Sequence, residues 1–97
     1  MYKVVIVDDE QSVRERLISL INRMKDDYEI IATYENGYDA LFCSSLNPDI
    51  LITDIKMPYV DGIELIKQLK LSLPLLKSVI ISGFDSFTYA QKAISLG

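Results

Sequence analysis

The stretch 50-ILITDIKMPYVDG-62 joins an aliphatic run that suits a buried β-strand to an aspartate and a tight loop. The run predicts a strand over 49–53, with Asp54 directly after its carboxyl end. Pro58 and Gly62 favour a tight loop before the next helix, which would hold the Asp54 carboxylate open toward solvent. A charged group so close to a predicted sheet interior needs polar or charged partners, and the ends of the other strands are the positions that could supply them.

Three further runs rich in Val and Ile alternate with stretches of helical character. The four strand candidates are 3–7, 29–34, 49–53 and 77–82. Apolar residues without polar alternation, as at 4–7, are typical of strands that are covered on both faces. The order βαβαβαβα with right-handed crossovers predicts an α/β fold with a doubly wound parallel sheet. If the order reverses once, as in flavodoxin-like sheets, the strands lie 2-1-3-4 and ligands bind between the first and third.

Apolar residues at helical spacing predict four amphipathic helices. The first begins near Gln11 or Ser12, and its apolar stripe consists of Val13, Leu17, Leu20, Ile21 and Met24. The second covers about 38–46 and the third about 61–72. The third ends before Pro74, and its apolar side consists of Ile63, Ile66, Leu69 and Leu73. The fourth is capped by Asp85 or Ser86 and ends near Gly97, with a stripe made of Phe87, Ala90, Ala93 and Ile94.

Composition indicates one ordinary soluble domain. The chain has 97 residues, of which 49% are hydrophobic and 25% charged, as in globular proteins. Ten basic and 14 acidic residues give a net charge of −4, which argues against direct binding of nucleic acid. Cys43 is the single cysteine, so neither a disulfide nor a Cys-based metal site is expected. Since neither a signal peptide nor a membrane span is apparent, we expect a cytoplasmic protein.

Acidic residues follow the two strands that should be neighbours at the switch point. Asp8 and Asp9 follow the first strand and Asp54 the third, so the three should converge, while Ser82 closes the fourth strand. Two like charges about 4 Å apart repel by roughly 4 kcal/mol at an effective dielectric near 20. Either a carboxyl takes up a proton or a divalent cation binds among the oxygens. Without His or Cys nearby, such a site suits Mg²⁺ or Mn²⁺.

Each of these residues also has a plainer interpretation. The acids in 8-DDE-10 precede a predicted helix and can serve as caps, and Ser82 can simply end a strand. Capping explains any one acid better than it explains three acids from two strand ends. A carboxylate such as that of Asp54 beside Mg²⁺ could attack phosphorus, because the cation shields its charge. Ser82 could then donate a hydrogen bond to a phosphoryl oxygen.

Three segments together resemble the receiver domain of bacterial two-component response regulators, over the whole of 1–97. They are VIVDDE at 5–10, DILITDIKMPYVDGIEL at 49–65 and VIISGFDSFTYAQKAISLG at 79–97. The resemblance implies a regulatory phosphoacceptor, not an enzyme, in which a partner histidine kinase phosphorylates Asp54. It further implies that Mg²⁺ is held by Asp9, Asp54 and the main-chain carbonyl of Lys56. Asp8 would assist through water, and Ser82 would occupy the hydroxyl switch position.

The resemblance also implies features beyond Gly97. The last segment is similar to receivers joined to an AraC-type helix-turn-helix output domain. The family continues with a fifth strand ending in lysine and a fifth helix, so we expect 1–97 to be one receiver domain that is incomplete at its C-terminus. The exposed edge of the fourth strand then predicts a homodimer, a strand-swapped dimer or marginal stability.

Two other functions are compatible with the same residues. One is a structural or dimerisation module that is not phosphorylated, because the C-terminal lysine is absent. The other is a Mg²⁺-dependent phosphatase with Asp54 as nucleophile. Lys56 argues against the phosphatase, since it stands two residues after Asp54, where a second acid would be expected.

Overall fold

The computed structural model describes residues 1–81 of the chain. Their four strands form one parallel sheet in the order β2-β1-β3-β4. The strands are β1 (Tyr2–Val7), β2 (Tyr28–Tyr34), β3 (Ile50–Asp54) and β4 (Lys77–Ile81). The predicted doubly wound sheet and its order 2-1-3-4 are therefore confirmed. The topological switch point, where the strand order reverses, lies between β1 and β3.

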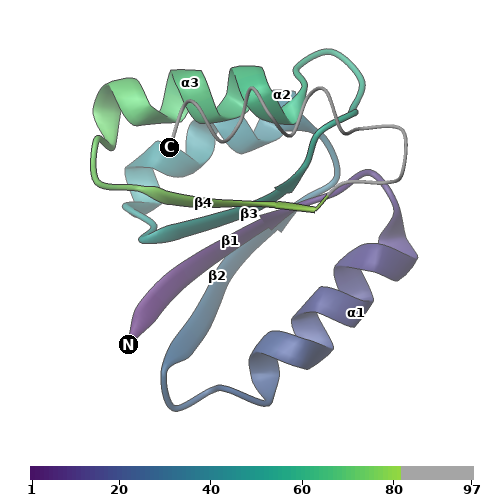
Figure 1. The fold of residues 1–97 in the computed structure, drawn as a ribbon, viewed down its shortest axis with the longest axis vertical. Coiled ribbons are helices and arrows are strands. Elements are labelled where there is room, and N and C mark those ends of the chain that lie inside the picture. Colours follow the sequence, from purple (N-terminus) through teal and green to yellow (C-terminus); the bar gives the residue numbers. More distant parts are fainter. Residues whose placement is uncertain (82–97) are drawn as a thin grey trace.

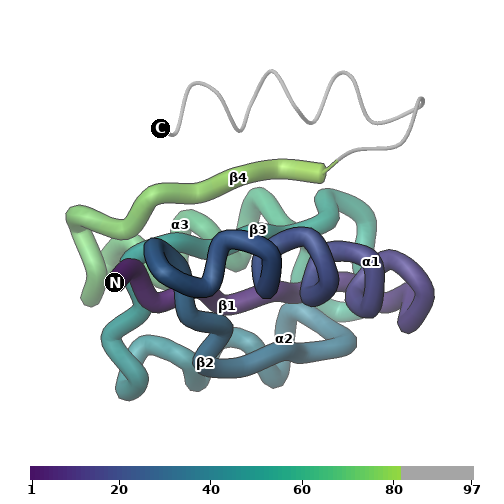
Figure 2. The backbone as a smooth tube through the Cα atoms, turned by 90° about the horizontal axis from the view of Figure 1, so that it is seen from below, coloured from purple at the N-terminus to yellow at the C-terminus, as the bar shows by residue number. Residues whose placement is uncertain are grey.

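Helices cover both faces of this sheet (Figures 1 and 2). Helix α1 (Gln11–Asn22) lies on one face, and α2 (Gly37–Ala40) and α3 (Gly62–Ser72) lie on the other. A 3₁₀ helix, η1 (Leu41–Leu46), continues directly from α2. Within residues 1–81, no helix has the length and apolar character that crossing a membrane would require.

The strand β1 supplies both halves of the core, because its successive side chains point to opposite faces. Val5 and Val7 belong to the larger cluster, which also contains Ala40, Cys43, Leu51, Leu65, Ile66 and Leu69. Val4 and Ile6 belong to a smaller cluster with Ile52, against which residues of α1 pack. The unalternated apolar run predicted to be covered on both faces is thus buried on both sides.

The second predicted helix, 38–46, is wrong in type. The α-helix covers only Gly37–Ala40, and Leu41–Leu46 form the 3₁₀ helix η1. Ala40 and Cys43 are both fully buried. Ala40 is the last residue of α2 and Cys43 lies in η1, and both contribute to the larger core cluster. Asn47, in the left-handed conformation with φ 53°, then ends the segment before β3.

The predicted apolar stripe of α1 needs correction as well. Leu17, Ile18 and Ile21 pack against the small cluster, whereas Leu20 and Met24 are 45% and 44% exposed. The helix ends at Asn22, so Met24 lies beyond it. The consequence is that α1 buries a narrower face than the sequence indicated.

The third predicted helix is confirmed to within one residue at its start. Asp61 caps α3 by accepting a hydrogen bond from the Glu64 amide. Leu65 is fully buried in addition to the predicted Ile66 and Leu69. The fourth predicted helix and Ser82, predicted as the last residue of the strand 77–82, lie outside the described residues.

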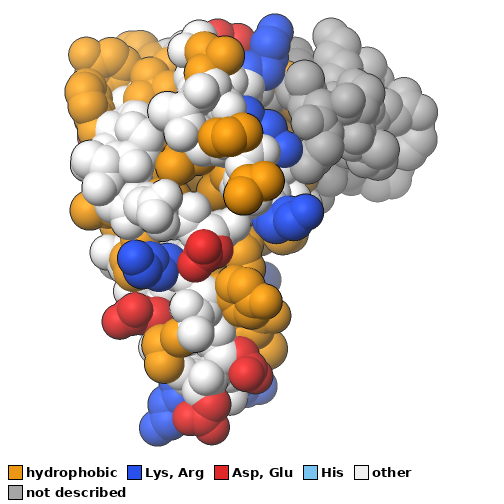
Figure 3. All heavy atoms as spheres, turned by 90° about the vertical axis from the view of Figure 1, so that its left-hand side faces the viewer, with side chains coloured by type: hydrophobic (Ala, Val, Ile, Leu, Met, Phe, Trp, Pro, Cys, Tyr) orange, Lys and Arg blue, Asp and Glu red, His pale blue; other side chains and the backbone are white. Residues whose placement is uncertain are grey.

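The two ends of the sheet differ in character. Figure 3 views the domain from the side on which the strands begin, where hydrophobic and charged side chains are mixed. Tyr2 at the start of β1 and Leu75 just before β4 are 58% and 88% exposed. The acidic residues singled out in the sequence lie at the opposite end of the sheet, where Asp8 and Asp9 follow β1 and Asp54 is the last residue of β3, one residue inside the strand predicted to end before it.

Candidate functional site at the carboxyl ends of β1 and β3

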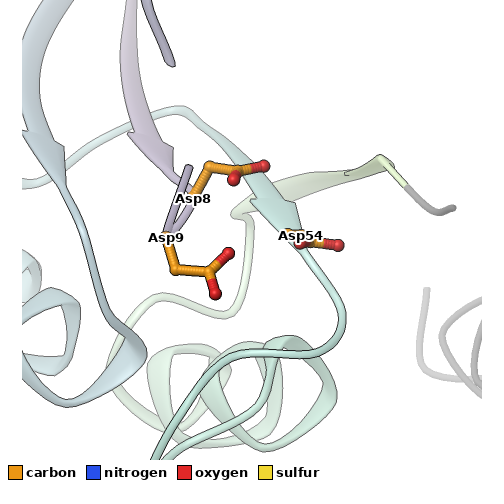
Figure 4. Close-up of side chains that lie close together, drawn as sticks. All are labelled: Asp8, Asp9 and Asp54. Carbon is orange, nitrogen blue, oxygen red and sulfur yellow. The ribbon is translucent and has the colours of Figure 1, made fainter. Parts of the chain in front are cut away.

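Parallel pairing of β1 with β3 brings three acids together (Figure 4). Val7 pairs with Thr53, so the next residues, Asp8 after β1 and Asp54 at the end of β3, lie at the same level on adjacent strands. One carboxylate oxygen from each of Asp8, Asp9 and Asp54 lies within 4.8 Å of the other two. The predicted convergence of these side chains is therefore present in the structure.

Asp8 is the buried member of the group, with 2% of its surface exposed. Its backbone amide donates to the Tyr34 carbonyl of β2 at 3.1 Å, and its Oδ1 accepts from the Glu10 amide at 2.9 Å. Burial raises the pKa of the Asp8 carboxyl, against the lowering effect of the Glu10 hydrogen bond. The adjacent acids raise this pKa further.

Capping of α1 does not account for these acids. The N-cap residue is Glu10, whose side chain makes no capping hydrogen bond. The Asp8 carboxylate bonds an amide that lies before the helix, two residues along the chain. Asp9 is exposed, and its carboxylate contributes to the acidic group. A local turn thus explains part of the position of Asp8 and leaves the grouping of all three acids unexplained.

Asp54 is half-buried, so the expectation of an open carboxylate holds only in part. Its Oδ1 accepts a hydrogen bond from the Ile55 amide at 2.7 Å, and its carbonyl accepts one from the Thr53 hydroxyl at 2.9 Å. Burial is the main cause that raises the pKa of Asp54, and the charges of Asp8, Asp9 and Glu10 act in the same direction. The carboxylate is held firmly at one oxygen in a site of excess negative charge.

Two close backbone contacts shape the loop after Asp54. A Cβ at Gly62 would lie 2.1 Å from the Asp54 carbonyl oxygen, and a Cβ at Gly37 would lie 2.1 Å from the Val60 carbonyl oxygen. Because neither contact leaves room for a side chain, glycine is required at both places. The Gly62 amide also donates to the Ile55 carbonyl at 2.7 Å. The predicted role of Gly62 in a tight loop is confirmed, while the role of Gly37 was missed.

The middle of this loop is a strained three-residue turn. The Val60 amide donates to the Pro58 carbonyl at 2.9 Å, and Tyr59 between them has φ 71°. These are the features of a γ-turn of the rare, strained form. The Tyr59 side chain is 92% exposed, so its burial does not offset the strain. The loop therefore owes its shape to the backbone contacts around it.

Arg14 of α1 is a neighbour of the site that the sequence did not indicate. Its Nη1 donates to the main-chain carbonyl of Asp8 at 2.6 Å. Its positive charge also acts to lower the pKa of Asp8. The signal in the sequence was a basic residue one helical turn inside α1, which is too common a pattern to indicate a site.

The donor set fits a hard divalent cation. Three carboxylates supply only oxygen ligands, and the chain contains no histidine. Mg²⁺ and Mn²⁺ prefer such ligands, and a cation would offset the repulsion between the acids. Lys56 is exposed on the loop two residues after Asp54. The metal-binding role of its carbonyl stays a prediction, as does the role of Ser82, which lies outside the described residues.

Comparisons with known proteins show the family and the fold of the chain. The family model of the response regulator receiver domain matches residues 4–97. The transcriptional regulatory proteins YesN and LnrK of Bacillus subtilis are 35% and 36% identical to this chain over its full length. The chain spans only 27% of YesN and 44% of LnrK.

A solved structure extends the similarity to three dimensions. The REC domain of AraT, a response regulator from Geobacillus stearothermophilus, superposes with a TM-score of 0.91 at 37% sequence identity. The match covers 99% of this chain and 75% of that one. With the family model matching almost all of its length, the chain belongs to the response regulator receiver domain family.

Proposed function

We propose that Asp54 accepts a phosphoryl group from a sensor histidine kinase in a Mg²⁺-dependent phosphorelay. The observation that carries this proposal is the convergence of Asp8, Asp9 and Asp54 within 4.8 Å at adjacent strand ends. Asp9, Asp54 and the Lys56 carbonyl would hold Mg²⁺ or Mn²⁺, with Asp8 assisting through water. When bound, the cation supplies positive charge that reduces repulsion between Asp54 and the incoming phosphoryl oxygens.

The hydrogen bonding of Asp54 supports different roles for its two oxygens. The Ile55 amide holds Oδ1 at 2.7 Å, which fixes the orientation of the carboxylate. The other oxygen, Oδ2, then attacks phosphorus in line with the leaving histidine nitrogen. A P–O bond forms as the P–N bond breaks, and the electron pair of that bond returns to the imidazole. In this proposal Ser82 donates a hydrogen bond to a phosphoryl oxygen and acts as the switch residue that responds to phosphorylation.

The chain acts as a regulatory domain in this proposal and catalyses no reaction on an outside substrate. Relatives that are similar over its full length are named as transcriptional regulatory proteins. We therefore propose that phosphorylation controls a DNA-binding output, of the AraC type, in the cytoplasm. The domain itself would contact neither nucleic acid nor membrane, in keeping with its net charge of −4.

The outer edge of β4 supports a proposal of self-association. In the part of the chain that the structure describes, β4 is the last strand of the sheet and pairs only with β3. Val79 in this strand is 48% exposed. Strand edges of this kind favour pairing with another chain. Dimerisation through β4 would accompany the phosphoacceptor function and does not replace it.

Intact-mass spectrometry after incubation with a small phosphodonor and Mg²⁺ tests the phosphoacceptor proposal. We expect a mass gain of one phosphoryl group that requires Mg²⁺ and disappears in Asp54→Asn. Asp26→Asn is the matched control, because this acid is exposed in the turn after α1. Donor hydrolysis without a lasting adduct would favour a phosphatase instead. The absence of both reaction and Mg²⁺ binding would favour a structural module.

A further inference from the structure

The carbonyl of Asp8 lies just past the end of β1, beyond the last residue that pairs with β3. Strand β1 ends at Val7, and the pairing with β3 extends from Val4 to Val7. The Arg14 guanidinium reaches back from α1 and donates to this carbonyl at 2.6 Å. Arg14 is half-buried, so solvent competes less for this hydrogen bond than it would at an exposed site.

This hydrogen bond fixes the peptide that joins the two acids. The Asp8 carbonyl and the Asp9 amide share one planar unit, so holding the oxygen also sets the direction in which the chain leaves toward Asp9. Asp8 has two further anchors, namely the Tyr34 carbonyl and the Glu10 amide. Asp9 has an exposed side chain, and its aim toward Asp54 depends mainly on the backbone that carries it.

We propose that Arg14 is a positioning residue for the cation site, acting through its hydrogen bond to the Asp8 carbonyl. This inference rests on the proposed Mg²⁺-dependent function of the same site. Groups that orient metal ligands commonly change metal affinity by ten- to a hundredfold when they are removed. The guanidinium charge has the opposite effect, because a positive charge beside the site repels Mg²⁺. When Arg14 is replaced, loss of the hydrogen bond should therefore lower the affinity for Mg²⁺, and loss of the charge should raise it.

The sign of the change in Mg²⁺ affinity, measured by calorimetric titration of the unphosphorylated protein, shows which of the two effects is larger. Arg14→Met keeps much of the apolar stem and removes both donor and charge, and we expect Mg²⁺ binding about tenfold weaker. Arg14→Lys restores a donor of similar reach and should bind Mg²⁺ close to wild type. Arg16→Met is the matched control, because it removes the same charge from an exposed position of α1. It should leave Mg²⁺ affinity unchanged.

The outcomes distinguish this inference from the proposed function. Mg²⁺ binding by Arg14→Met that equals or exceeds wild type, in a variant with native circular dichroism, would overturn the positioning role. If Arg14→Met does not fold, weak Mg²⁺ binding by the folded Arg14→Lys variant would equally overturn it. Wild-type protein that neither binds Mg²⁺ nor accepts a phosphoryl group would refute the proposed function itself. A phosphorylation rate that falls in Arg14→Met and recovers in Arg14→Lys at equal Mg²⁺ occupancy would give independent support.

Discussion

Replacing Asp54 by Asn should stabilise the metal-free protein. The three carboxylates lie within 4.8 Å of one another, and Asn keeps the shape of the side chain and an acceptor for the Ile55 amide. At this distance a charge pair repels by about 1 kcal/mol in water and about 3.5 kcal/mol at an effective dielectric of 20. Because Asp9 is exposed and Asp54 only half-buried, the lower figure is the better guide.

The pH dependence of this gain follows from the direction of the pKa shift. Burial raises the pKa of Asp54 in the folded protein above the ordinary value of 3.8. Well below pH 3.8 the carboxyl is protonated in both the folded and the unfolded state, so its ionisation costs no stability. As the pH rises through the folded pKa toward neutrality, the cost of ionisation is expressed in full. The stability advantage of Asp54→Asn over wild type should therefore increase with rising pH.

Thermal and urea unfolding in the presence of a chelator measure this difference. We expect Asp54→Asn to exceed wild type by about 1 kcal/mol at neutral pH, which corresponds to about 4 to 8 °C in Tm for a domain of this size. Asp26→Asn should leave the stability unchanged. Mg²⁺ at about a hundred times its dissociation constant should stabilise wild type by about 2.7 kcal/mol and Asp54→Asn by much less. Equal or lower stability of metal-free Asp54→Asn at neutral pH would refute this account of the site.

Four other predictions concern the loop, the core and the sheet edge. Gly62→Ala places a Cβ 2.1 Å from the Asp54 carbonyl, so urea unfolding should show a loss of about 2 kcal/mol or more; wild-type stability would contradict this contact. Tyr59→Gly removes backbone strain of about 1 to 3 kcal/mol and adds about 0.5 to 1 kcal/mol of conformational entropy cost on folding. The folded protein should therefore become more stable by about 1 kcal/mol in urea unfolding, and a clear loss of stability would argue against the strained turn. The Cys43 thiol is buried and its pKa is raised to about 11, so a thiol reagent should modify it far more slowly in native protein than in urea, and equal rates would contradict its burial. Light scattering should show association that increases with concentration, whereas a monomer at every concentration with a Tm well above about 60 °C would exclude self-association through β4.

Patterns in the sequence were sufficient to predict the sheet and the acidic site. The run around Val5 and Ile6 is apolar without alternation because both faces of β1 are covered, and this feature distinguishes a parallel central strand. Strand order then places the residues after β1 and β3 side by side. Asp8, Asp9 and Asp54 could therefore be grouped from topology alone, before any distance was known.

Other features of the structure could not be predicted from the sequence, because they depend on contacts between distant segments. Gly37 belongs to a turn-like Glu-Asn-Gly sequence, and only the packing of Val60 against it shows why a side chain is excluded. The 3₁₀ form of η1 leaves no mark on the apolar pattern, because Ala40 and Cys43, which are both buried and three residues apart, would share one face of an α-helix as well. Arg14 has an ordinary place in an amphipathic pattern, and its bond to the Asp8 carbonyl appears only once α1 is placed on the sheet.

Locating the phosphoryl group within the chain tests the central claim most directly. The protein is incubated with a small phosphodonor and Mg²⁺, any acyl phosphate is reduced with borohydride, and the peptides are sequenced by mass spectrometry. The proposed function predicts modification of Asp54, dependent on Mg²⁺, with Asp8 and Asp9 unmodified. A phosphoryl group on another residue, or unmodified Asp54 in folded protein that binds Mg²⁺, would contradict it.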